Sequence, residues 1–537
     1  MNPVSPPPVI RSRFPGGPFA RIGGLTLLSL VVLLTSAIPL GIPGEWTWAR
    51  RALLEIDPPA ILGAAILGLG YWFAVRWGDR WLTLSPPITP ATEPAQLPRR
   101  LLLASVLLGL TWQGGLLLLP PDYQGIARSP TVLYYKRTEG YFWQAAFEIT
   151  DTPRFLREYH KSISEGNDPD RYLHLGTHPP GLTLSYRFVL SLFEHCPPLA
   201  EFVTATAPPA AREALDTLRD FPTPRGLPLS LAEEATLWSA TLLTLIVTAM
   251  TSWPIGRLAA RIAGPMAGWR AAVLWPLVPS LLVFFPKSDL LCPVIATSSC
   301  WLWLEGWSRR RWGLCCLAGV GFFGGLMLTL ALAPVALLLA VQTIAERSTR
   351  RAEFASRSPG QDVRLVLAAT AGLVAPIIAL SVWGGCPIIR IWIENLRNHA
   401  LFYTHNARSY ALWLLINPLE AALAMGLPIA SLVGLGLWRS LGSRTPRPME
   451  WSHNMAWLAV WGFLWLSGKN MGEAARLWIF LAPWPVISAA AVTVAPSSDS
   501  ASANRFWTVI LGLQLLMTIV TTNVIDGFHF AELIPAQ

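Results

Sequence analysis

The side chains with the clearest chemical potential gather in one polar stretch of the chain, Pro121–Thr177, and just beyond it. Glu139 lies ahead of a helical pattern over Tyr141–Ile149, where a carboxylate meets the positive end of the helix dipole. Asp151 follows that pattern, and His178 comes at the end of the stretch. Carboxylates and imidazoles are the groups that most often move protons in catalysis, so these three residues are the candidates for acid–base chemistry.

Each of these residues also has a purely structural explanation. For Glu139, that explanation is a negative charge that stabilises the start of a helix and has no other role. His178 precedes two prolines, which restrict the backbone to an extended entry into the next helix. Asp151-Thr-Pro is a common signal for a turn or a helix start. Residue type alone favours these structural roles, so the case for catalysis depends on the residues taken together.

The candidates for binding a substrate lie at the start of the helical pattern and at the ends of later apolar segments. They are Tyr141, Asp289, Arg408, Lys469, Glu473 and Arg476. A guanidinium grips a phosphate with two hydrogen bonds, whereas a lysine acts as a point charge. Glu473 and Arg476 are spaced i, i+3, so they can equally pair with each other. His399 and His405 are expected to be hydrogen-bonded surface groups.

The elements that must position these side chains are membrane-spanning helices. The 537 residues are 53% hydrophobic and 14% charged, with a mean hydropathy of +0.43, whereas soluble domains carry roughly a quarter charged residues. Five stretches are nearly free of charge: Leu25–Ile42, Leu101–Leu119, Thr236–Ile255, Val366–Trp383 and Trp507–Val524. Each approaches the ~20 residues that a helix needs to cross ~30 Å of hydrocarbon. The sequence therefore predicts an all-α polytopic membrane protein.

Basic clusters between the apolar stretches predict the orientation, because cytoplasmic loops carry an excess of Lys and Arg. The clusters are Arg11–Arg21, Arg76–Arg100, Arg257–Arg270, Arg309–Arg311, Arg347–Arg364 and Arg439–Arg447. They favour about 13 transmembrane helices, with the C-terminus outside. Gly181–Leu192 is interrupted by Arg187 and is expected to be a short or re-entrant helix.

The predicted organisation has four parts. They are a cytoplasmic tail (1–24), three transmembrane helices (25–120), a long, partly helical extracytoplasmic catalytic loop with juxtamembrane helices (121–180), and a helical bundle with short basic cytoplasmic loops (181–537). Five polar features then face one side of the membrane: the long loop, Asp289, an expected loop at Cys386–Tyr410, a turn at Lys469–Arg476 and the tail after Val524. A non-catalytic scaffold would have no reason to gather them there.

Several functional classes fit poorly. The cytoplasmic loops are short and contain no Gly-rich phosphate cradle of the Walker type, which argues against an ATP-driven pump. The net charge of +9 reflects orientation, since the basic residues lie between spans, and it predicts no nucleic-acid partner. The main alternative is a transporter or flippase of lipid-linked or small polar substrates. Against it, the spans show no internal repeat and few charges lie within them.

Two motifs resemble the GT-C glycosyltransferases, a superfamily that includes protein O-mannosyltransferases and bacterial aminoarabinose-type lipid A transferases. Glu139 in Thr-Glu-Gly-Tyr-Phe-Trp matches the acidic residue of their first extracytoplasmic loop, and His178-Pro-Pro-Gly matches their Pro-Pro helix start. Phe-Pro-Lys-Ser-Asp289 is similar to their P-x-x-D element. Arg408–Pro428 and Gly472–Trp484 resemble elements of uncharacterised bacterial multispan glycosyltransferases.

Two features depart from the pattern of that superfamily. Its members usually carry a paired acidic motif, whereas Thr138 precedes Glu139 here. A second carboxylate would have to come from Glu148, Asp151 or Asp289, which leaves a divalent metal ion an open question. The long loop also follows the third predicted span, and in the superfamily it more often follows the first.

The resemblance implies a hexosyl- or pentosyltransferase that uses a polyprenyl-phosphate sugar donor and an acceptor hydroxyl on a lipid, glycan or protein, with inversion of configuration. Glu139 would take the acceptor proton, while Arg408 and Arg476 would stabilise the leaving phosphate. Asp151 and His178 would orient the acceptor. No organic cofactor is implied. The composition favours a bacterial inner membrane, with membrane lipids around the spans and the active site on the extracytoplasmic face.

Overall fold

The computed structural model describes residues 18–52, 55–84, 96–121, 125–165, 174–221, 223–349, 359–442, 448–494 and 500–527. Several sequence features lie wholly or partly outside these ranges. They are the first residues of the predicted tail with Arg11 and Arg13, parts of the basic segments at 85–95, 350–358 and 443–447, part of the long loop at 166–173, and the C-terminal tail from 528 onward.

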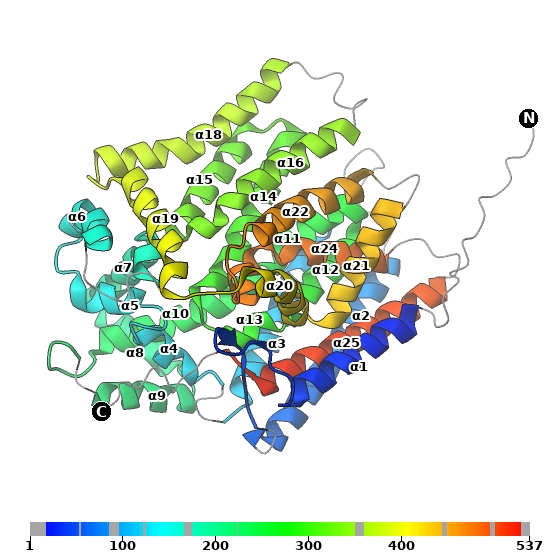
Figure 1. The fold of residues 1–537 in the computed structure, drawn as a ribbon, viewed down its shortest axis with the longest axis horizontal. Coiled ribbons are helices and arrows are strands. Elements are labelled where there is room, and N and C mark those ends of the chain that lie inside the picture. Colours follow the sequence, from blue (N-terminus) through cyan, green and yellow to red (C-terminus); the bar gives the residue numbers. More distant parts are fainter. Residues whose placement is uncertain are drawn as a thin grey trace, which may run out of the picture.

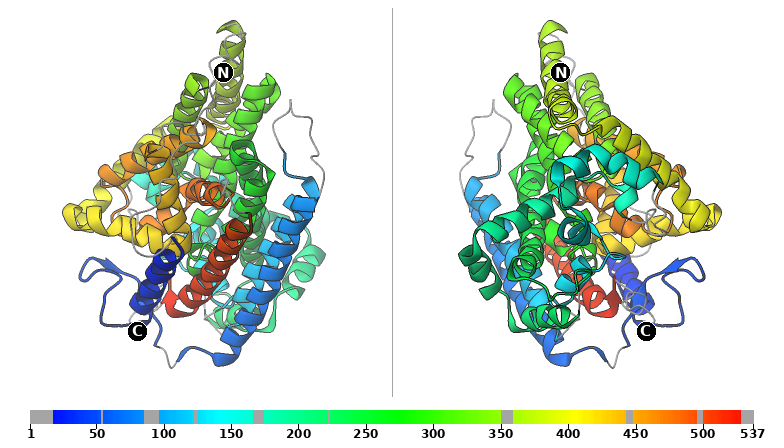
Figure 2. Two further views of the ribbon diagram at one scale, coloured as in Figure 1. Left: turned by 90° about the vertical axis from the view of Figure 1, so that its right-hand side faces the viewer. Right: turned by 90° about the vertical axis from the view of Figure 1, so that its left-hand side faces the viewer.

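Almost all of the described chain is helical, and the N-terminal part begins with three apolar helices. They are α1 (Pro18–Leu34), α2 (Pro58–Leu84) and α3 (Arg99–Leu118). Contacts join both α1 and α2 to the last helix, α25 (Ser500–Val524), so the two ends of the chain lie side by side on one flank (Figures 1 and 2).

The polar stretch after α3 folds into a group of short helices on the opposite flank (Figure 1). They are α4 (Arg128–Tyr134), α5 (Tyr141–Trp143), η3 (Gln144–Glu148), α6 (Thr152–Glu165), η5 (Leu175–Thr177), α7 (Gly181–His195), α8 (Pro197–Ala205) and α9 (Pro209–Asp220). This group packs on α10 (Leu231–Met250), which contacts α4, α7 and α8. The predicted long loop is therefore a folded cap rather than an extended connection.

The remaining helices form the bundle. They are α11 (Ser252–Ala263), α12 (Pro265–Leu274), η6 (Trp275–Leu277), α13 (Ser280–Val283), η7 (Ser288–Leu291), α14 (Cys292–Arg309), α15 (Trp312–Leu328), η8 (Leu330–Leu332), α16 (Ala333–Thr349), α18 (Pro359–Val382), α19 (Ile388–His405), α20 (Tyr410–Met425), α21 (Leu427–Gly442), α22 (Pro448–Leu466), α23 (Ala474–Leu477), η9 (Ile479–Leu481) and α24 (Pro483–Thr493). The segment Pro265–Val283 runs through the middle, with 94% of its most apolar window buried.

The chain is an all-α integral membrane protein. Among the described residues, seven helices are long and apolar enough to cross a membrane, or eight if a bent pair counts as one span. On α18 only 11% of the apolar window is buried, so the helix exposes a large apolar surface that suits contact with lipid. Three further apolar helices of the described residues, including α15, are shorter than these candidates.

The predicted count of about 13 spans is not confirmed, since the described residues contain seven or eight candidates by length and hydropathy. The segment Ala411–Trp438, predicted as one span, is two helices, α20 and α21, bent by 115° where Gly426 has φ +86°. Gly181–Leu192, expected to be short or re-entrant, lies in α7, whose 15 residues are fewer than the ~20 of a full crossing. The prediction of a loop at Cys386–Tyr410 was wrong, since most of this segment is the 18-residue helix α19.

Four very short strands form two antiparallel pairs, one within the segment after α1 and one that joins this segment to the end of α25. β1 (Gly41–Ile42) pairs with β2 (Trp46–Thr47), and β3 (Ala49–Arg50) pairs with β4 (Ile525–Asp526), both antiparallel. The β1–β2 turn is anchored by Glu45, whose carboxylate accepts hydrogen bonds from the Ser409 N–H at 2.9 Å and the Trp413 indole at 2.7 Å. The N-terminal hairpin is thereby held against α20.

Candidate active site

Glu139 is a buried carboxylate with one satisfied and one unsatisfied oxygen. Its side chain is 1% exposed, and its Oε1 accepts a hydrogen bond from the Ser288 N–H at 2.6 Å. Its Oε2 has no hydrogen-bond partner. Burial and the nearby Asp289 raise the pKa of Glu139 above its ordinary value, although Lys287 and the Ser288 N–H act in the opposite direction. A carboxylate of raised pKa with a bare oxygen is suited to accept a proton.

The backbone at Gly140 turns Glu139 toward Ser288. Gly140 has φ +79°, a left-handed conformation that ends the turn after α4 and leads into α5. A Cβ added at Gly140 would lie 3.0 Å from the Lys136 carbonyl oxygen and 3.2 Å from the Leu175 Cγ. The position therefore requires glycine for its backbone angle and for its surroundings.

We expect Gly140→Ala to destabilise the protein, because a left-handed alanine costs about 1–2 kcal/mol before any crowding is counted. Gly44→Ala is the matched control: Gly44 has φ +83°, but nothing lies within 4 Å of an added Cβ. The midpoint of thermal unfolding in lipid should fall further for Gly140→Ala than for Gly44→Ala. Equal midpoints would show that the crowding around Gly140 does not matter.

The turn after α13 supplies the groups that face Glu139. Lys287 is 4% exposed, and its ammonium donates a hydrogen bond to the Thr138 carbonyl oxygen. Burial and the nearby Arg476 lower the pKa of Lys287 to about 8, although Glu139 and Asp289 favour its charged form. Ser288 offers its backbone N–H, and Asp289 follows directly. One turn thus places a cation, a hydrogen-bond donor and a carboxylate around Glu139.

Arg476 continues this charged network. Its Nε lies 3.4 Å from Asp289 Oδ2, and its Nη2 lies 3.0 Å from Glu473 Oε1. Burial lowers the pKa of Arg476, but the carboxylates of Glu473, Asp289 and Glu139 together raise it. The i, i+3 pairing of Glu473 with Arg476 does form, and Arg476 bridges two carboxylates at once.

Two side chains of α20 hold the turn that carries Arg476. Asn417 Oδ1 accepts a hydrogen bond from the Gly472 N–H at 3.2 Å, and Glu420 Oε1 accepts one from the Ala475 N–H at 3.3 Å. These bonds satisfy N–H groups at the start of α23, which would otherwise lack partners. The position of Arg476 therefore depends on the bent helix pair.

His178 is presented in a defined tautomer. Its Nδ1 lies 2.9 Å from the His174 carbonyl oxygen, which can only accept, so Nδ1 carries the proton and Nε2 keeps a lone pair when the ring is neutral. Burial lowers the pKa of His178, which favours the neutral ring. The backbone is fixed as well, since the His178 carbonyl accepts hydrogen bonds from Tyr159 and Asn395 at 2.9 and 3.0 Å. The Tyr141 ring contacts the imidazole edge-on, with 5.9 Å between ring centroids.

These groups line a cavity of about 220 Å³, here named the first cavity. Seven of the nine candidate residues border it: Glu139, Tyr141, His178, Asp289, Lys469, Glu473 and Arg476. Its lining is largely apolar elsewhere, with Leu396 and Phe402 from α19, Leu464 from α22 and Phe480 from η9. The cavity therefore has a charged end and an apolar side, here named the apolar flank.

Asp151 and Arg408 are not among the residues that line the first cavity. Asp151 is exposed at the start of α6, where its Oδ1 accepts a hydrogen bond from the Arg154 N–H at 3.0 Å, as expected for a helix start. The Arg408 guanidinium lies 5.8 Å from the centre of the Trp413 ring, and its Nη1 lies against Gly472. The cation beside Glu139 is instead Lys287.

Several lining residues were not predicted from the sequence. They are His174, Lys287, Ser288, Asn395, Tyr403 and Asn470, and also His399, which was expected on the surface. Lys287 and Ser288 lie within the Phe-Pro-Lys-Ser-Asp motif, so that motif was the signal for them. Asn395 and His399 are spaced i, i+4 on α19, a spacing that would have indicated one polar helix face.

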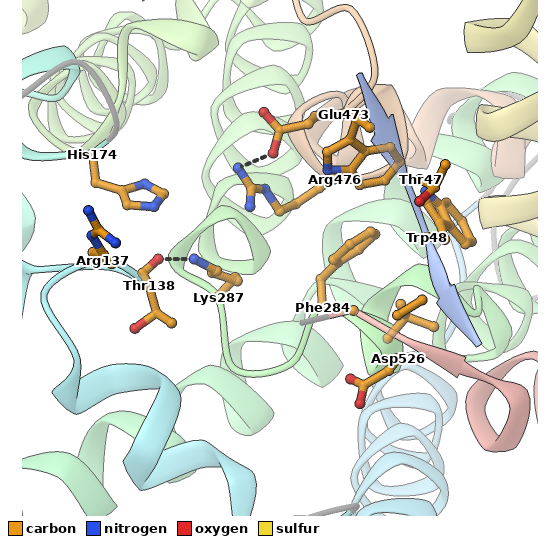
Figure 3. A pocket seen from close by; sticks show the side chains of 14 residues that line it. Thr47, Trp48, Arg137, Thr138, His174, Phe284, Lys287, Glu473, Arg476 and Asp526 are labelled. Atoms are coloured by element: carbon orange, nitrogen blue, oxygen red, sulfur yellow. Dashed lines mark hydrogen bonds and ion pairs between the residues drawn. The ribbon is translucent and has the colours of Figure 1, made fainter. Parts of the chain in front are cut away.

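A second cavity of about 180 Å³ lies beside the first. The two share the side chains of His174, Lys287, Glu473 and Arg476, here named the dividing wall. Figure 3 shows the second cavity with Arg137 and His174 at one side, Thr47 and Trp48 at the other, and Lys287 and Arg476 between them. Thr138 lines the second cavity and Glu139 the first, so neighbouring residues border the two spaces.

The carboxylates of the first cavity do not fit a divalent metal ion. Within the described ranges, no group of three His, Cys, Asp or Glu residues is placed to hold one. Asp289 and Glu473 both pair with Arg476, and Lys287 lies near Glu139. Fixed side-chain cations therefore already surround these carboxylates.

Comparison with known proteins identifies similar folds. No family model matches the sequence, and no curated protein matches it. The chain is similar to the apo oligosaccharyltransferase of Archaeoglobus fulgidus, at 14% identity and a TM-score of 0.43, over 80% of this chain and 56% of that one. It is also similar to AglB of the same organism in complex with an inhibitory peptide and a dolichol-phosphate, at 14% identity and a TM-score of 0.37, over 79% and 56%.

The chain spans just over half the length of these two structures. Both of those structures are of an archaeal oligosaccharyltransferase. Since no family model matches and the identity is low, the chemistry of this chain has to be inferred from its own side chains.

Proposed function

We propose that this protein is a membrane glycosyltransferase that moves a sugar from a polyprenyl-phosphate donor to an acceptor hydroxyl. The observation that carries the proposal is the bare Oε2 of buried Glu139, in a cavity that also holds Lys287, Lys469 and Arg476. A proton acceptor beside a cluster of cations is the arrangement that such a transfer requires, because a hydroxyl must lose a proton while a phosphate leaves.

The first cavity suits a lipid-linked anionic donor. Arg476 and Lys469 offer positive charge to a phosphate, and the guanidinium can bind two of its oxygens. The apolar flank at Leu396 and Phe480 offers a surface to the first part of a polyprenyl chain. A purely polar substrate would leave that flank exposed to water, so the combination favours a sugar phosphate attached to a lipid.

The reaction is a single displacement. Glu139 Oε2 takes the proton of the acceptor hydroxyl, and the acceptor oxygen forms a bond to the anomeric carbon of the donor. The bond from that carbon to the phosphate oxygen breaks, and polyprenyl phosphate leaves with the bonding electrons. The configuration at the anomeric carbon inverts. Arg476 and Lys287 stabilise the negative charge that develops on the leaving phosphate.

His178 has a supporting role in this mechanism. Its Nδ1 is committed to the His174 carbonyl, so its Nε2 lone pair is directed elsewhere and can accept a hydrogen bond from a sugar hydroxyl. Tyr141 keeps the ring in place by edge contact. The site would face the extracytoplasmic side of a bacterial inner membrane, where lipid-linked sugars are presented.

One assay in proteoliposomes separates this function from transport. The protein is reconstituted with radiolabelled polyprenyl-phosphate sugars on one side and a membrane extract as the source of acceptors. A glycosyltransferase moves label from the donor to another molecule, and the label becomes resistant to the mild acid that cleaves the donor. A flippase only changes the accessibility of an intact donor, and that result would overturn the proposal.

The rate of transfer should fall on both the acidic and the basic side of a pH optimum. Glu139 must be ionised to act, and its raised pKa places the acid limb above the pH expected for an ordinary glutamate, with a pKa of about 4.3. Activity is therefore lost as the pH falls through that raised pKa. Lys287 must be charged, and its pKa of about 8 makes activity fall as the pH rises past that value.

Measuring kcat/KM against pH for the wild type and for Lys287→Arg checks this assignment. Arginine stays charged at all pH values tested, since its pKa lies above ~12. The basic limb should vanish in Lys287→Arg while the acid limb remains. A basic limb that stays near pH 8 in the variant would assign it to another group.

A further inference from the structure

The second cavity has a lining of mixed character that the transfer mechanism does not use. Trp46 and Trp48 from the N-terminal segment and Phe284 from the turn after α13 give it aromatic surface. Arg137 and Asp526 add charges of opposite sign, and the dividing wall adds Lys287 and Arg476 with Glu473. Segments far apart in the sequence meet here, since β2 contributes Trp46 and Thr47 and β4 contributes Asp526 (Figure 3).

This lining discriminates between classes of ligand. A lipid tail would offer no hydrogen bonds to the polar groups that border this space, among them Arg137, Thr138 and Asp526, and covering polar groups with hydrocarbon is costly. Lys287 donates to the Thr138 carbonyl, Glu473 pairs with Arg476 at 3.0 Å, and Asp526 lies 4.0 Å from Arg128, so these charges already have partners within the protein. A neutral ring with several hydroxyls suits such a lining, because its hydroxyls can donate to a carboxylate or accept from a cation without adding a charge. Its apolar face can lie on an aromatic ring.

The size of the cavity agrees with one such ring. Its volume of about 180 Å³ is many times the roughly 10–15 Å³ that a single ordered water requires, so the space can hold a small polar molecule such as one sugar unit.

The aromatic surface is held rigidly in place. Trp48 donates its indole N–H to Glu420 Oε1 at 3.2 Å and contacts Phe284 edge-on, with 6.0 Å between ring centroids. Trp46 contacts Trp48 at 6.3 Å and Trp413 at 6.4 Å. A surface ordered before the ligand arrives loses little entropy on binding, which is typical of a recognition site.

The position of the cavity indicates which substrate it serves. The first cavity, with its apolar flank, accounts for a lipid-linked donor, and the second has no such flank. The second cavity adjoins the first through the dividing wall, and Thr138, which borders it, directly precedes the proposed base Glu139 in the chain. We propose that the second cavity is the acceptor subsite and that it binds a neutral sugar ring, so the acceptor is a saccharide. The assignment of this site to the acceptor rests on the proposed function, whereas the binding of a neutral sugar does not.

The test measures sugar binding without a donor and without turnover. The full-length protein in lipid nanodiscs is titrated with methyl glycosides of neutral hexoses and pentoses, and tryptophan fluorescence reports binding. Methyl glucuronide and methyl glucosaminide serve as the anionic and cationic counterparts. We expect at least one neutral glycoside to bind, and to bind more tightly than either charged sugar.

Variants locate the binding. Trp46→Ala should weaken the affinity about tenfold, and Trp46→Phe should weaken it less, since an aromatic contact is worth roughly 0.5–1.5 kcal/mol. Arg137→Gln provides a second variant that leaves the hairpin intact. Trp383→Ala is the control, because Trp383 is 86% exposed at the end of α18 and borders neither cavity. Thermal unfolding confirms that each variant is folded.

The outcomes separate this inference from the proposed function. Failure of every neutral glycoside to bind, or affinities unchanged in both Trp46→Ala and Arg137→Gln, would overturn the subsite even if sugar transfer is observed. Tighter binding of a charged sugar would overturn the neutral class. Binding that depends on Trp46 and Arg137 would support the subsite even if no transfer occurs, and the proposed function would then fail alone.

Discussion

Replacing Glu139 with glutamine should slow sugar transfer by about 10²–10⁴, the usual contribution of a general base. The amide cannot accept the acceptor proton, yet its oxygen can still receive the hydrogen bond that the Ser288 N–H gives to Oε1 at 2.6 Å. The variant also removes a buried negative charge, so it should fold at least as well as the wild type. The loss should therefore appear in kcat and not in the unfolding midpoint.

The control for this variant is Glu158→Gln, the same chemical change on a carboxylate of α6 whose side chain is 53% exposed and pairs with Arg154. Its transfer rate should equal that of the wild type, because exposed ion pairs contribute little. Initial rates at saturating donor and acceptor make the comparison. Wild-type rates in Glu139→Gln would remove Glu139 from the mechanism.

Replacing Arg476 with glutamine is expected to lower kcat/KM for the donor by about 10²–10³, the range found when one stabilising donor of a transition-state charge is lost. The phosphate would lose a bidentate partner, and Asp289 and Glu473 would lose the cation between them. Arg476→Lys should recover part of the loss, since the charge remains but the planar fork does not. Arg397→Gln, on the exposed side of α19, is the matched control.

The unfolding midpoint of Arg476→Gln should also fall, because two partly buried carboxylates are left without their partner. For this reason Arg476→Lys is the variant that tests catalysis, and its fold should stay close to the wild type. If Arg476→Lys and Arg476→Gln both transferred sugar at the wild-type rate, the leaving phosphate would have to be bound elsewhere.

The membrane character and the helical class could be predicted from the sequence because they depend on local apolar runs. The segments at Pro58–Leu84, Arg99–Leu118 and Gly360–Val382 are long and nearly uncharged, and each is a candidate span. The count of spans is harder to predict, because a run can be long enough to cross while the backbone turns inside it. Gly426 bends α20 away from α21 by 115°, and hydropathy does not detect a bend.

The charged end of the first cavity was predictable in part for a similar reason. Glu139, Asp289 and Arg476 were assigned to one side of the membrane by the basic clusters, and the structure places them around one space. Lys287 was missed because its burial depends on the Thr138 carbonyl, far away in the sequence. Arg408 looked equivalent to Arg476, but it packs against Gly472 and Trp413 and is not among the residues that line the cavity.

The second cavity could not be predicted from sequence at all. It is built from an N-terminal hairpin, the turn after α13, α23 and the strand at the C-terminal end, and no local pattern links these segments. Trp46 and Trp48 looked like two of the 26 tryptophans of a membrane protein, which are common at the lipid interface. Their distinction lies in two contacts with the distant helix α20: Glu45 of the hairpin accepts a hydrogen bond from the Trp413 indole, and the Trp48 indole donates one to Glu420.

The most direct test of the central claim is transfer of sugar by the purified protein from a panel of radiolabelled polyprenyl-phosphate hexoses and pentoses to membrane extract, with wild type and Glu139→Gln side by side. The account predicts that one donor labels an acceptor, that the anomeric configuration of the product is inverted, and that the label is lost in Glu139→Gln. Equal labelling by both proteins, or retention of configuration, would contradict it.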